Sequence, residues 1–351
     1  MHVCLLGPVP PPWGGVQTHV MDVRQTVRAA GHRCSLINVT RHRSQEADDV
    51  YYPDSPIELL RRIRSLRPDV VHIHAGGDFL LRYAALFLAL TLGLRQRTVF
   101  TFHSGGFPGS DTGRRARRWS VRGFALRRLS AVIGVNAELM DVFRRYGVAE
   151  SRRHLIPPYV PTFDVESVRQ ETLPDSLASF VATHSPLFLT VGLLEPEYAI
   201  DQQFIAMEDL ARDLPASGLL VVGSGSLDAE LRTAAAKNSR ASHIMICGDV
   251  ARRHTLKLIS SADLLLRTTR YDGDAISVRE ALTLGTRVIA TDNGMRPAGV
   301  TLIPVLTPES IAETARQTLA TSAPPRTDDT TNAALRNLVA LFERVQAGVK
   351  G

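Results

Sequence analysis

Short runs of β-branched and other apolar residues alternate along this chain with longer segments that have the period of a helix, and the alternation runs through two series. This pattern is typical of a parallel sheet in which helices cross over between the strands. A polar segment marked by prolines, residues 157–186, separates the two series and is interpreted as a connector. The sequence therefore predicts an α/β protein with two doubly wound, Rossmann-like domains.

The boundaries of the predicted strands and helices follow from where the strand pattern and the helix pattern change, and from the turn residues between them. The predicted strands are residues 2–6, 33–39, 69–74, 97–102, 131–135 and 153–156, then 187–191, 218–222, 243–246, 263–267 and 287–291. The predicted helices are residues 16–30, 57–67, 79–92, 114–128 and 137–146, then 199–213, 226–237, 252–260, 277–284, 308–320 and 331–346. We expect domains at 1–170 and 171–325, with a helix in 326–351 that packs back on the first domain.

Length, hydropathy and cysteine positions indicate the cellular compartment of this protein. Its 351 residues suffice for two full cores. No basic leader with a cleavage site precedes the first strand, and the longest apolar run, 79–94, contains Arg82 and is shorter than the roughly 20 residues of a membrane helix. Cys4, Cys34 and Cys247 lie in apolar, strand-like segments without the spacing of a metal site or a disulfide. We therefore expect a cytoplasmic protein with reduced cysteines.

The positive charge lies in the first half of the chain. Residues 1–170 hold 24 Arg and no Lys against 14 Asp plus Glu, a net +10, and the remaining 17 basic and 21 acidic residues give −4. This asymmetry indicates an anionic partner such as a phosphorylated acceptor or a phospholipid surface, although 38 Arg against 3 Lys also fits a compositional bias. The Arg-rich segment 114–128 favours contact with the anionic inner membrane surface over nucleic acid, which we do not expect as a partner.

Two loops of the first half are candidate binding sites. Gly14 and Gly15 end a loop before a predicted helix, where free amides and the helix dipole suit a phosphate, although the spacing is not a dinucleotide fingerprint and a simple turn also fits. His103 follows a predicted strand and precedes Gly105, a place from which it can hydrogen-bond a sugar hydroxyl. His72 and His74 share one face of the preceding strand. Without a carboxylate or cysteine to complete the three histidines, no metal site is expected.

The second half offers three more loops after strands. Gly223, Ser224 and Gly225 precede a helix and suit an anion, and the segment Gly248, Asp249, Val250 can present backbone groups to a base. Residues 267–282 carry Asp272 and Asp274 before a predicted helix start at Ser277. Glu280 then fits either a capping box with Ser277 or a carboxylate that accepts hydrogen bonds from two ribose hydroxyls, and the two roles are compatible.

In their order, these motifs resemble the retaining glycosyltransferases of family four, which have the GT-B fold of two Rossmann-like domains. The resemblance spans almost the whole chain through GGVQTHVMDV, GHRCSL, DVVHIH, TFH, VGLLEPEYAID, VVGSGSL, CGDV and DGDAISVREALTLGTRVIATDNG. It implies that Glu280 holds the donor ribose, that Asp272 replaces the glutamate of a paired-acid motif, and that His103 contacts the transferred sugar. It also implies that Gly14 and Gly15 approach the donor diphosphate or the acceptor. The backbone amides of Gly273, Asp274, Ala275, Ile276 and Ser277 would contact the donor. Acceptor contacts are expected from Trp13, Gln17, His74 and Gly105.

One departure concerns the leaving diphosphate. The family has an arginine and a lysine at the positions of Leu193 and Tyr198, and we hypothesise that Arg267, Arg270 or Arg279 replaces this cationic clamp, although all three also fit surface salt bridges.

The sequence thus predicts retaining, metal-independent transfer of a hexosyl or N-acetylhexosaminyl group. The donor is expected to be a UDP- or GDP-sugar, with no cofactor besides this co-substrate, and the acceptor a hydroxylated sugar, lipid-linked sugar or small molecule. The alternatives are an epimerase, a pseudo-glycosyltransferase and an inactive nucleotide-sugar-binding subunit.

Overall fold

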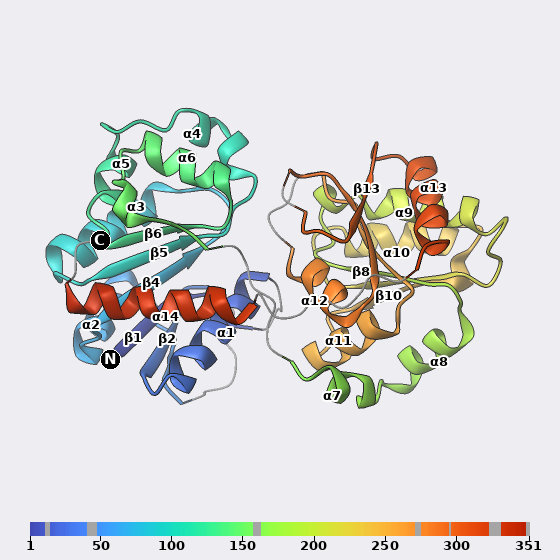
Figure 1. Ribbon diagram of the computed structural model, residues 1–351, viewed down its shortest axis with the longest axis horizontal. Helices are drawn as coiled ribbons and strands as arrows, with labels where there is room; N and C mark the ends of the chain where they lie inside the picture. The colour runs from blue at the N-terminus through green and yellow to red at the C-terminus, as the bar shows by residue number, and fades with distance from the viewer. Residues whose placement is uncertain are drawn as a thin grey trace. The chain divides into compact units, whose positions relative to one another are not determined.

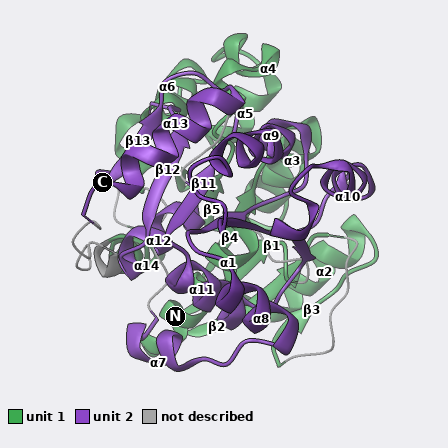
Figure 2. Cartoon of the chain, turned by 90° about the vertical axis from the view of Figure 1, so that its right-hand side faces the viewer, with its two compact units in different colours: residues 1–159, 330–351 green, residues 160–329 purple. Residues whose placement is uncertain are grey.

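The computed structural model divides the chain into two compact units, Met1–Tyr159 with Thr330–Gly351, and Val160–Asp329 (Figures 1 and 2). It describes residues 1–10, 15–40, 48–156, 163–270, 275–294, 296–322 and 331–348. Within each unit the strands form one parallel sheet with helices on both faces. The predicted fold class is confirmed.

The first unit contains a sheet of the order β3-β2-β1-β4-β5-β6-β7. Its strands are β1 (His2–Gly7), β2 (Arg33–Asn38), β3 (Val50–Tyr51), β4 (Val70–Ala75), β5 (Thr98–Phe102), β6 (Ala131–Gly134) and β7 (Arg153–Leu155). Its helices are α1 (Gly15–Ala29), α2 (Pro56–Leu66), α3 (Leu81–Leu88), α4 (Asp111–Arg114), α5 (Val121–Leu126), α6 (Ala137–Arg145) and α14 (Thr331–Ala347). A π-helical turn, Ala89–Gly93, extends α3, and 3-10 turns lie at Phe107–Gly109 and Glu150–Arg152.

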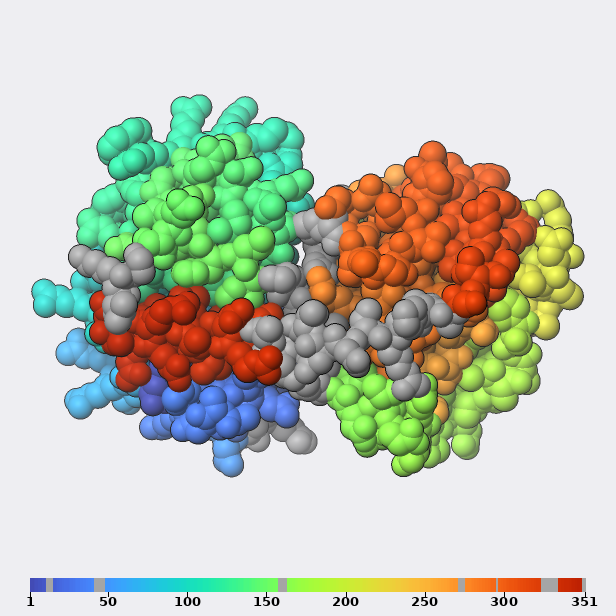
Figure 3. Space-filling view, viewed as in Figure 1, coloured from blue at the N-terminus to red at the C-terminus, as the bar shows by residue number. Residues whose placement is uncertain are grey.

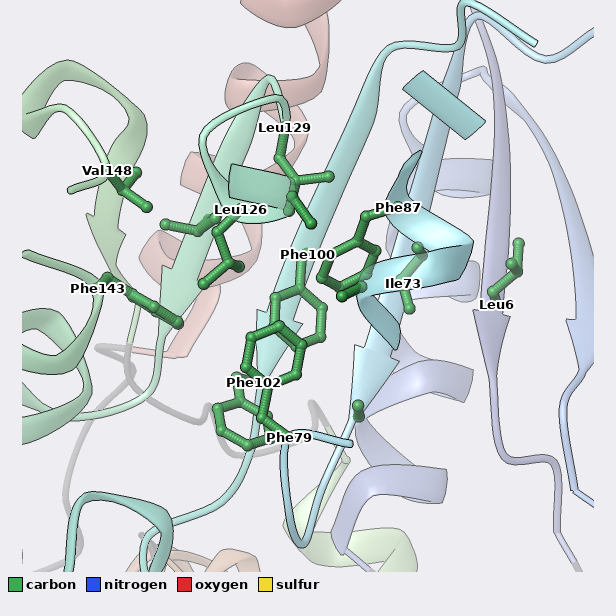
Figure 4. Packing of buried hydrophobic residues seen from close by; sticks show 14 of the residues in the cluster. Leu6, Ile73, Phe79, Phe87, Phe100, Phe102, Leu126, Leu129, Phe143 and Val148 are labelled. Atoms are coloured by element: carbon green, nitrogen blue, oxygen red, sulfur yellow. The ribbon is translucent and has the colours of Figure 1, made fainter. Parts of the chain in front are cut away.

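Two apolar clusters cover the two faces of this sheet. On one face Phe79, Phe100 and Phe102 lie within about 6 Å of one another, ring centroid to ring centroid (Figure 4). Replacing one such buried phenylalanine by alanine costs about 3 to 5 kcal/mol. On the other face α1 packs with α14, which brings Phe342 to 5.0 Å from the ring of His72 on β4. Figure 3 shows α14 (red) lying over the first part of the chain (blue). The last helix therefore belongs to the core of the first unit.

The second unit contains a sheet of the order β10-β9-β8-β11-β12-β13. Its strands are β8 (Leu187–Val191), β9 (Gly218–Val222), β10 (Ile244–Gly248), β11 (Leu264–Arg267), β12 (Arg287–Thr291) and β13 (Val300–Ile303). Its helices are α7 (Val165–Gln170), α8 (Asp175–Thr183), α9 (Ile200–Leu210), α10 (Asp228–Lys237), α11 (Arg252–Ser261), α12 (Ile276–Leu284) and α13 (Pro308–Leu319), with 3-10 turns at Pro196–Tyr198 and Ala241–His243.

The predicted strands agree closely with the observed ones, and the structure adds the edge strands β3 and β13. The prediction of one basic helix over residues 114–128 was wrong. Ser110 and Ser120 each accept a hydrogen bond from the amide three residues later, at 3.1 and 3.0 Å, and so begin the separate helices α4 and α5. The predicted connector 157–186 was wrong in its second part, which forms α7 and α8. No helix in the described segments is long and apolar enough to cross a membrane.

Candidate functional site

Each sheet has a point where the order of its strands reverses, between β1 and β4 in the first unit and between β8 and β11 in the second. Open parallel sheets bind ligands beside such a point, at the carboxyl ends of the strands. In the first unit this edge carries Gly7, at the end of β1, and His74, near the end of β4. In the second unit it carries Val191 and Arg267, the last residues of β8 and β11.

Histidines gather at the strand ends of the first unit. Nδ1 of His74 lies 3.2 Å from Nε2 of His103, whose amide donates to the carbonyl of Ala75 at 2.8 Å. His19 comes from α1, and the centroid of its ring lies 5.3 and 4.7 Å from those of His74 and His103. His72 lies deeper, 4.0 Å from His74 between ring centroids, and its Nε2 is 2.7 Å from the hydroxyl of Thr101. The fold thus joins side chains from α1, β4 and the loop after β5.

Burial makes these imidazoles neutral at pH 7. It lowers the pKa of His103 to about 4 and that of His72 to about 3, in the latter case with a smaller contribution from His103. Burial, followed by neighbouring histidines, holds the pKa values of His19 and His74 well below their usual range. Neutral imidazoles donate and accept hydrogen bonds without carrying charge. This edge therefore suits hydroxyl groups better than phosphates.

The other residues predicted for the first unit surround α1 and the loop after β5. Gly15 is exposed at the start of α1, Gln17 is half-buried two residues before His19, and Gly105 is half-buried two residues after His103. Trp13 and Gly14 lie outside the described residues.

A cation lies at the strand ends of the second unit. The guanidinium of Arg267 lies 4.7 Å from the centroid of the Tyr198 ring, and its Nη1 donates to the carbonyl of Val191 at 3.1 Å. The hydroxyl of Thr268 donates to the carbonyl of Tyr198 at 2.8 Å. A Cβ on Gly192 would lie 2.3 Å from the Tyr198 ring, so only glycine fits there. Arg267 is therefore packed against the loop that carries Leu193 and Tyr198, the two departures from the family pattern.

The neighbouring glycine loop is shaped by close contact with the loop after β8. A Cβ on Gly223 would lie 1.8 Å from the carbonyl oxygen of Gly192, and one on Gly225 2.4 Å from that of Leu194. The amide of Ser226 donates to the carboxylate of Glu195 at 2.8 Å, so this loop already holds an anion of the chain.

The structure ties the glycine loop to the loop after β10. The hydroxyl of Ser224 donates to Asp249 at 2.8 Å, beside Gly248 and the half-buried Val250. The donor-binding residues predicted after β9 and β10 therefore lie together.

Glu280 lies inside α12, and its capping-box interpretation was wrong. The helix begins at Ile276 after Ala275, with no side-chain cap. Glu280 is 3% exposed, and its Oε1 instead accepts from Nη2 of Arg252 at 2.6 Å. Burial raises the pKa of Glu280, and Arg252 partly offsets that rise. A buried carboxylate with one cationic partner keeps acceptor capacity for further donors, such as ribose hydroxyls.

The remaining predicted residues are distributed around this helix. Ser277 is buried and Arg279 half-buried on α12, whereas Arg270 is exposed and its amide donates to the carbonyl of Glu197 at 2.7 Å. Asp272, Gly273 and Asp274 lie outside the described residues.

Sequence reasoning missed His19 and Arg252, which complete the two clusters. Both are on helices, and neither follows a strand directly. The sequence did contain a signal for His19. This residue lies four positions after Gly15, which puts both on one face of a helix.

Two models of protein families match the chain. The family model described as Glycosyltransferase Family 4 matches residues 13–162, and the one described as Glycosyl transferases group 1 matches residues 177–319. No curated protein sequence matches the chain significantly.

Solved structures share the fold at low sequence identity. The structure of Anabaena Alr3699/HepE in complex with UDP-glucose has a TM-score of 0.67 and 16% identity, covering 99% of this chain and 99% of that one. A glycosyltransferase from Rickettsia africae has a TM-score of 0.69 and 15% identity, with 99% of each chain covered. Sucrose-phosphate synthase from Thermosynechococcus elongatus has a TM-score of 0.63 and 18% identity, covering 99% of this chain and 94% of that one.

Proposed function

Since this chain belongs to glycosyltransferase family 4 and has the GT-B fold, we propose that it is a retaining enzyme that transfers a sugar from a nucleoside diphosphate donor to a hydroxyl acceptor. UDP-sugars are the first donors to test, because the similar HepE structure holds UDP-glucose. The proposed group is a hexosyl or N-acetylhexosaminyl residue. The proposed acceptor is a sugar, a lipid-linked sugar or a small molecule.

The observation that carries this proposal is the position of Arg267. Its guanidinium lies against Tyr198 and the carbonyl of Val191, at the point of strand reversal where a diphosphate would bind. A cation held there stabilises the charge that develops as the sugar leaves the diphosphate. Arg267 thus compensates for Leu193 and Tyr198 in the clamp positions, with Arg270 and Arg279 as the alternatives. This argues against the inactive-subunit alternative, which rested on those two residues.

The other groups supply orientation. Glu280 accepts hydrogen bonds from the ribose hydroxyls, and His103 accepts or donates one at a sugar hydroxyl. The leaving phosphate can itself take the acceptor's proton, so the reaction needs no second carboxylate at hydrolase spacing and no metal ion. We therefore propose transfer that continues in the presence of a chelator.

A surface of the first unit supports the proposed contact with an anionic membrane at the cytoplasmic side. Trp119 is 87% exposed, with the guanidinium carbons of Arg118 and Arg127 at 5.4 and 5.9 Å from its ring centroid. Val121 and Phe124 on α5 are also exposed. Exposed aromatic and apolar side chains among arginines fit the interface of an anionic bilayer.

A donor screen tests the proposed reaction. Purified protein in EDTA is mixed with UDP-, GDP-, TDP- and ADP-sugars, and thermal shift and release of nucleoside diphosphate are recorded. We expect one donor to stabilise the protein, and an acceptor hydroxyl to accelerate diphosphate release with retained anomeric configuration in the product, measured by NMR. Release of a rearranged donor without acceptor would instead indicate an epimerase. No stabilisation by any donor would contradict the proposal.

A further inference from the structure

Three histidines of the first unit each bring a ring nitrogen close to those of the other two. The nitrogens of His19, His74 and His103 all lie within 4.8 Å of one another. They come from α1, from β4 and from the loop after β5, so only the folded unit brings them together. His19 and His74 are buried, and His103 is half-buried.

The spacing of two of these nitrogens fits a shared metal ion. In a tetrahedral zinc site with Zn–N distances of about 2.0 to 2.1 Å, two ligand nitrogens are about 3.3 Å apart. Nδ1 of His74 and Nε2 of His103 are 3.2 Å apart. His19, at no more than 4.8 Å, would have to approach by about 1.5 Å at most, which side-chain rotation can supply.

The cluster also has unused bonding capacity. Among the described residues, Nε2 of His74 and Nδ1 of His72 are buried and have no hydrogen-bond partner. A buried polar atom without a partner costs free energy, so native proteins usually provide one. Hydrogen bonds within the chain therefore do not satisfy every ring nitrogen of these histidines, although the nitrogen of His74 that faces His103 is Nδ1.

We propose that His19, His74 and His103 form a binding site for a transition-metal ion such as Zn²⁺, with a fourth position open beside His103. Three protein ligands with one open position is a common zinc arrangement, and imidazole also suits Cu, Ni and Co, whereas Mg²⁺ and Ca²⁺ prefer oxygen. This inference departs from the expectation drawn from the sequence, which considered His72, His74 and His103 and lacked His19.

A consequence for activity rests on the proposed function. His103 is proposed to contact the transferred sugar, and an ion that holds its Nε2 competes with that contact. Bound Zn²⁺ is therefore inhibitory, and a chelator restores transfer.

Direct binding tests the site without any substrate. Untagged full-length protein is treated with EDTA, dialysed, and titrated with Zn²⁺ in a calorimeter and with Co²⁺ in a spectrophotometer. We expect one ion per chain and visible Co²⁺ bands that are stronger than those of the aqueous ion. His103→Gln and His19→Gln should each weaken Zn²⁺ binding on the order of 100-fold. His32→Gln is the control, because the half-buried His32 is paired with Glu343 outside this cluster, and its substitution should leave binding unchanged.

Each contrary result is decisive. A Co²⁺ spectrum like that of the aqueous ion, no Zn²⁺ binding by the native protein, or binding that survives both His103→Gln and His19→Gln would overturn the site. Because His103 is half-buried on a loop, its substitution should preserve the fold, which circular dichroism checks. Transfer that persists with saturating Zn²⁺ bound would overturn the inhibition alone. Failure of every donor would contradict the proposed function and leave the binding result standing.

Discussion

The two units share one sheet topology but present different chemistry at the point of strand reversal. On β4 and in the loop after β5 the first unit places buried and half-buried imidazoles, and the lowering of their pKa values keeps them neutral. Around β11 and α12 the second unit places Arg267 against Tyr198, and it pairs the buried Glu280 with the half-buried Arg252. A doubly wound sheet therefore fixes where a ligand binds, and the side chains at the strand ends decide which ligand. Neutral groups suit sugar hydroxyls, and charged groups suit a diphosphate and a ribose.

Substitution of Glu280 should have the largest effect, because the proposed ribose contact depends on a buried carboxylate. Glu280→Gln keeps the side-chain volume but replaces one acceptor oxygen by a donor. We expect kcat/KM for the donor to fall on the order of 100-fold or more, since hydrogen bonds to a charged group contribute about 1.5 to 3 kcal/mol each. Glu313→Gln on the surface of α13 is the matched control. An unchanged kcat/KM in a folded Glu280→Gln protein would remove the ribose role.

Within the two candidate sites, some residues could be predicted from the sequence and others could not. His103 stood out because it directly follows a strand, and Glu280 because it lies in a long segment that resembles the family. The partners His19 and Arg252 did not, because their role depends on which face of a helix packs against the sheet. The capping-box interpretation of Glu280 was wrong because the chain enters α12 through Ala275 and Arg252 takes the carboxylate.

The break within residues 114–128 has a local cause that was visible in the sequence. Ser120 is the N-cap residue of α5, and Gly123, three residues later, is a weak helix former that packs within 2.7 Å, measured from an added Cβ, of the carbonyl oxygen of Arg117. The Arg-rich composition indicated an amphipathic helix more strongly than these two residues indicated its interruption.

Arg267 provides the second test of the difference between the units. Arg267→Gln removes the cation proposed to stabilise the diphosphate, and we expect the Kd for the donor to rise about 30- to 100-fold, the loss of one charge-assisted bidentate contact. Calorimetric titration with the donor measures it. Arg270→Gln and Arg279→Gln are compared in parallel, and we expect less than about a threefold change from either.

The outcome across the three arginines is decisive. A large loss of donor affinity in Arg270→Gln or Arg279→Gln, with the affinity of Arg267→Gln unchanged, would assign the role of the cationic clamp to that other arginine. Unchanged affinity in all three would reject the replacement of the clamp by arginine. Arg212→Gln, in an exposed pair with Asp209, is a control for general charge effects.

Lowering the pH should reduce the free energy of unfolding of the first unit before that of the second. His72 is fully buried beside His74 and Thr101, and its pKa of about 3 lies below the usual 6.5. Below pH 6.5 the unfolded chain therefore binds a proton at His72 that the folded unit does not bind. The free energy of unfolding consequently falls as the pH falls from about 6.5 toward 3. Each pH unit in that window costs about 1.4 kcal/mol per such histidine, or about 2 kcal/mol at pH 5.

Hydrogen exchange compares the two units under the same conditions. Peptides from β4 and β5 should lose protection between pH 7 and pH 5, after correction for the intrinsic exchange rate, more than peptides from β8 and β9. Fluorescence gives a second reading, because both tryptophans of the sequence, Trp13 and Trp119, belong to the first unit. Equal losses in both units would show that the buried histidines do not set the acid sensitivity.

Substitution of Trp119 should have the smallest effect of the four, and this effect should be confined to membrane binding. Because this side chain is 87% exposed, Trp119→Ala should change the free energy of unfolding by no more than about 0.5 kcal/mol. Its loss from a bilayer interface should lower partitioning onto vesicles that contain anionic phospholipid by about tenfold at low salt. Val305→Ala removes an exposed apolar side chain from the second unit and should change neither quantity. Sedimentation with vesicles measures the partitioning. Equal binding to neutral and anionic vesicles, or an equal loss in Val305→Ala, would mean that the arginine-flanked surface of the first unit does not direct the protein to a membrane.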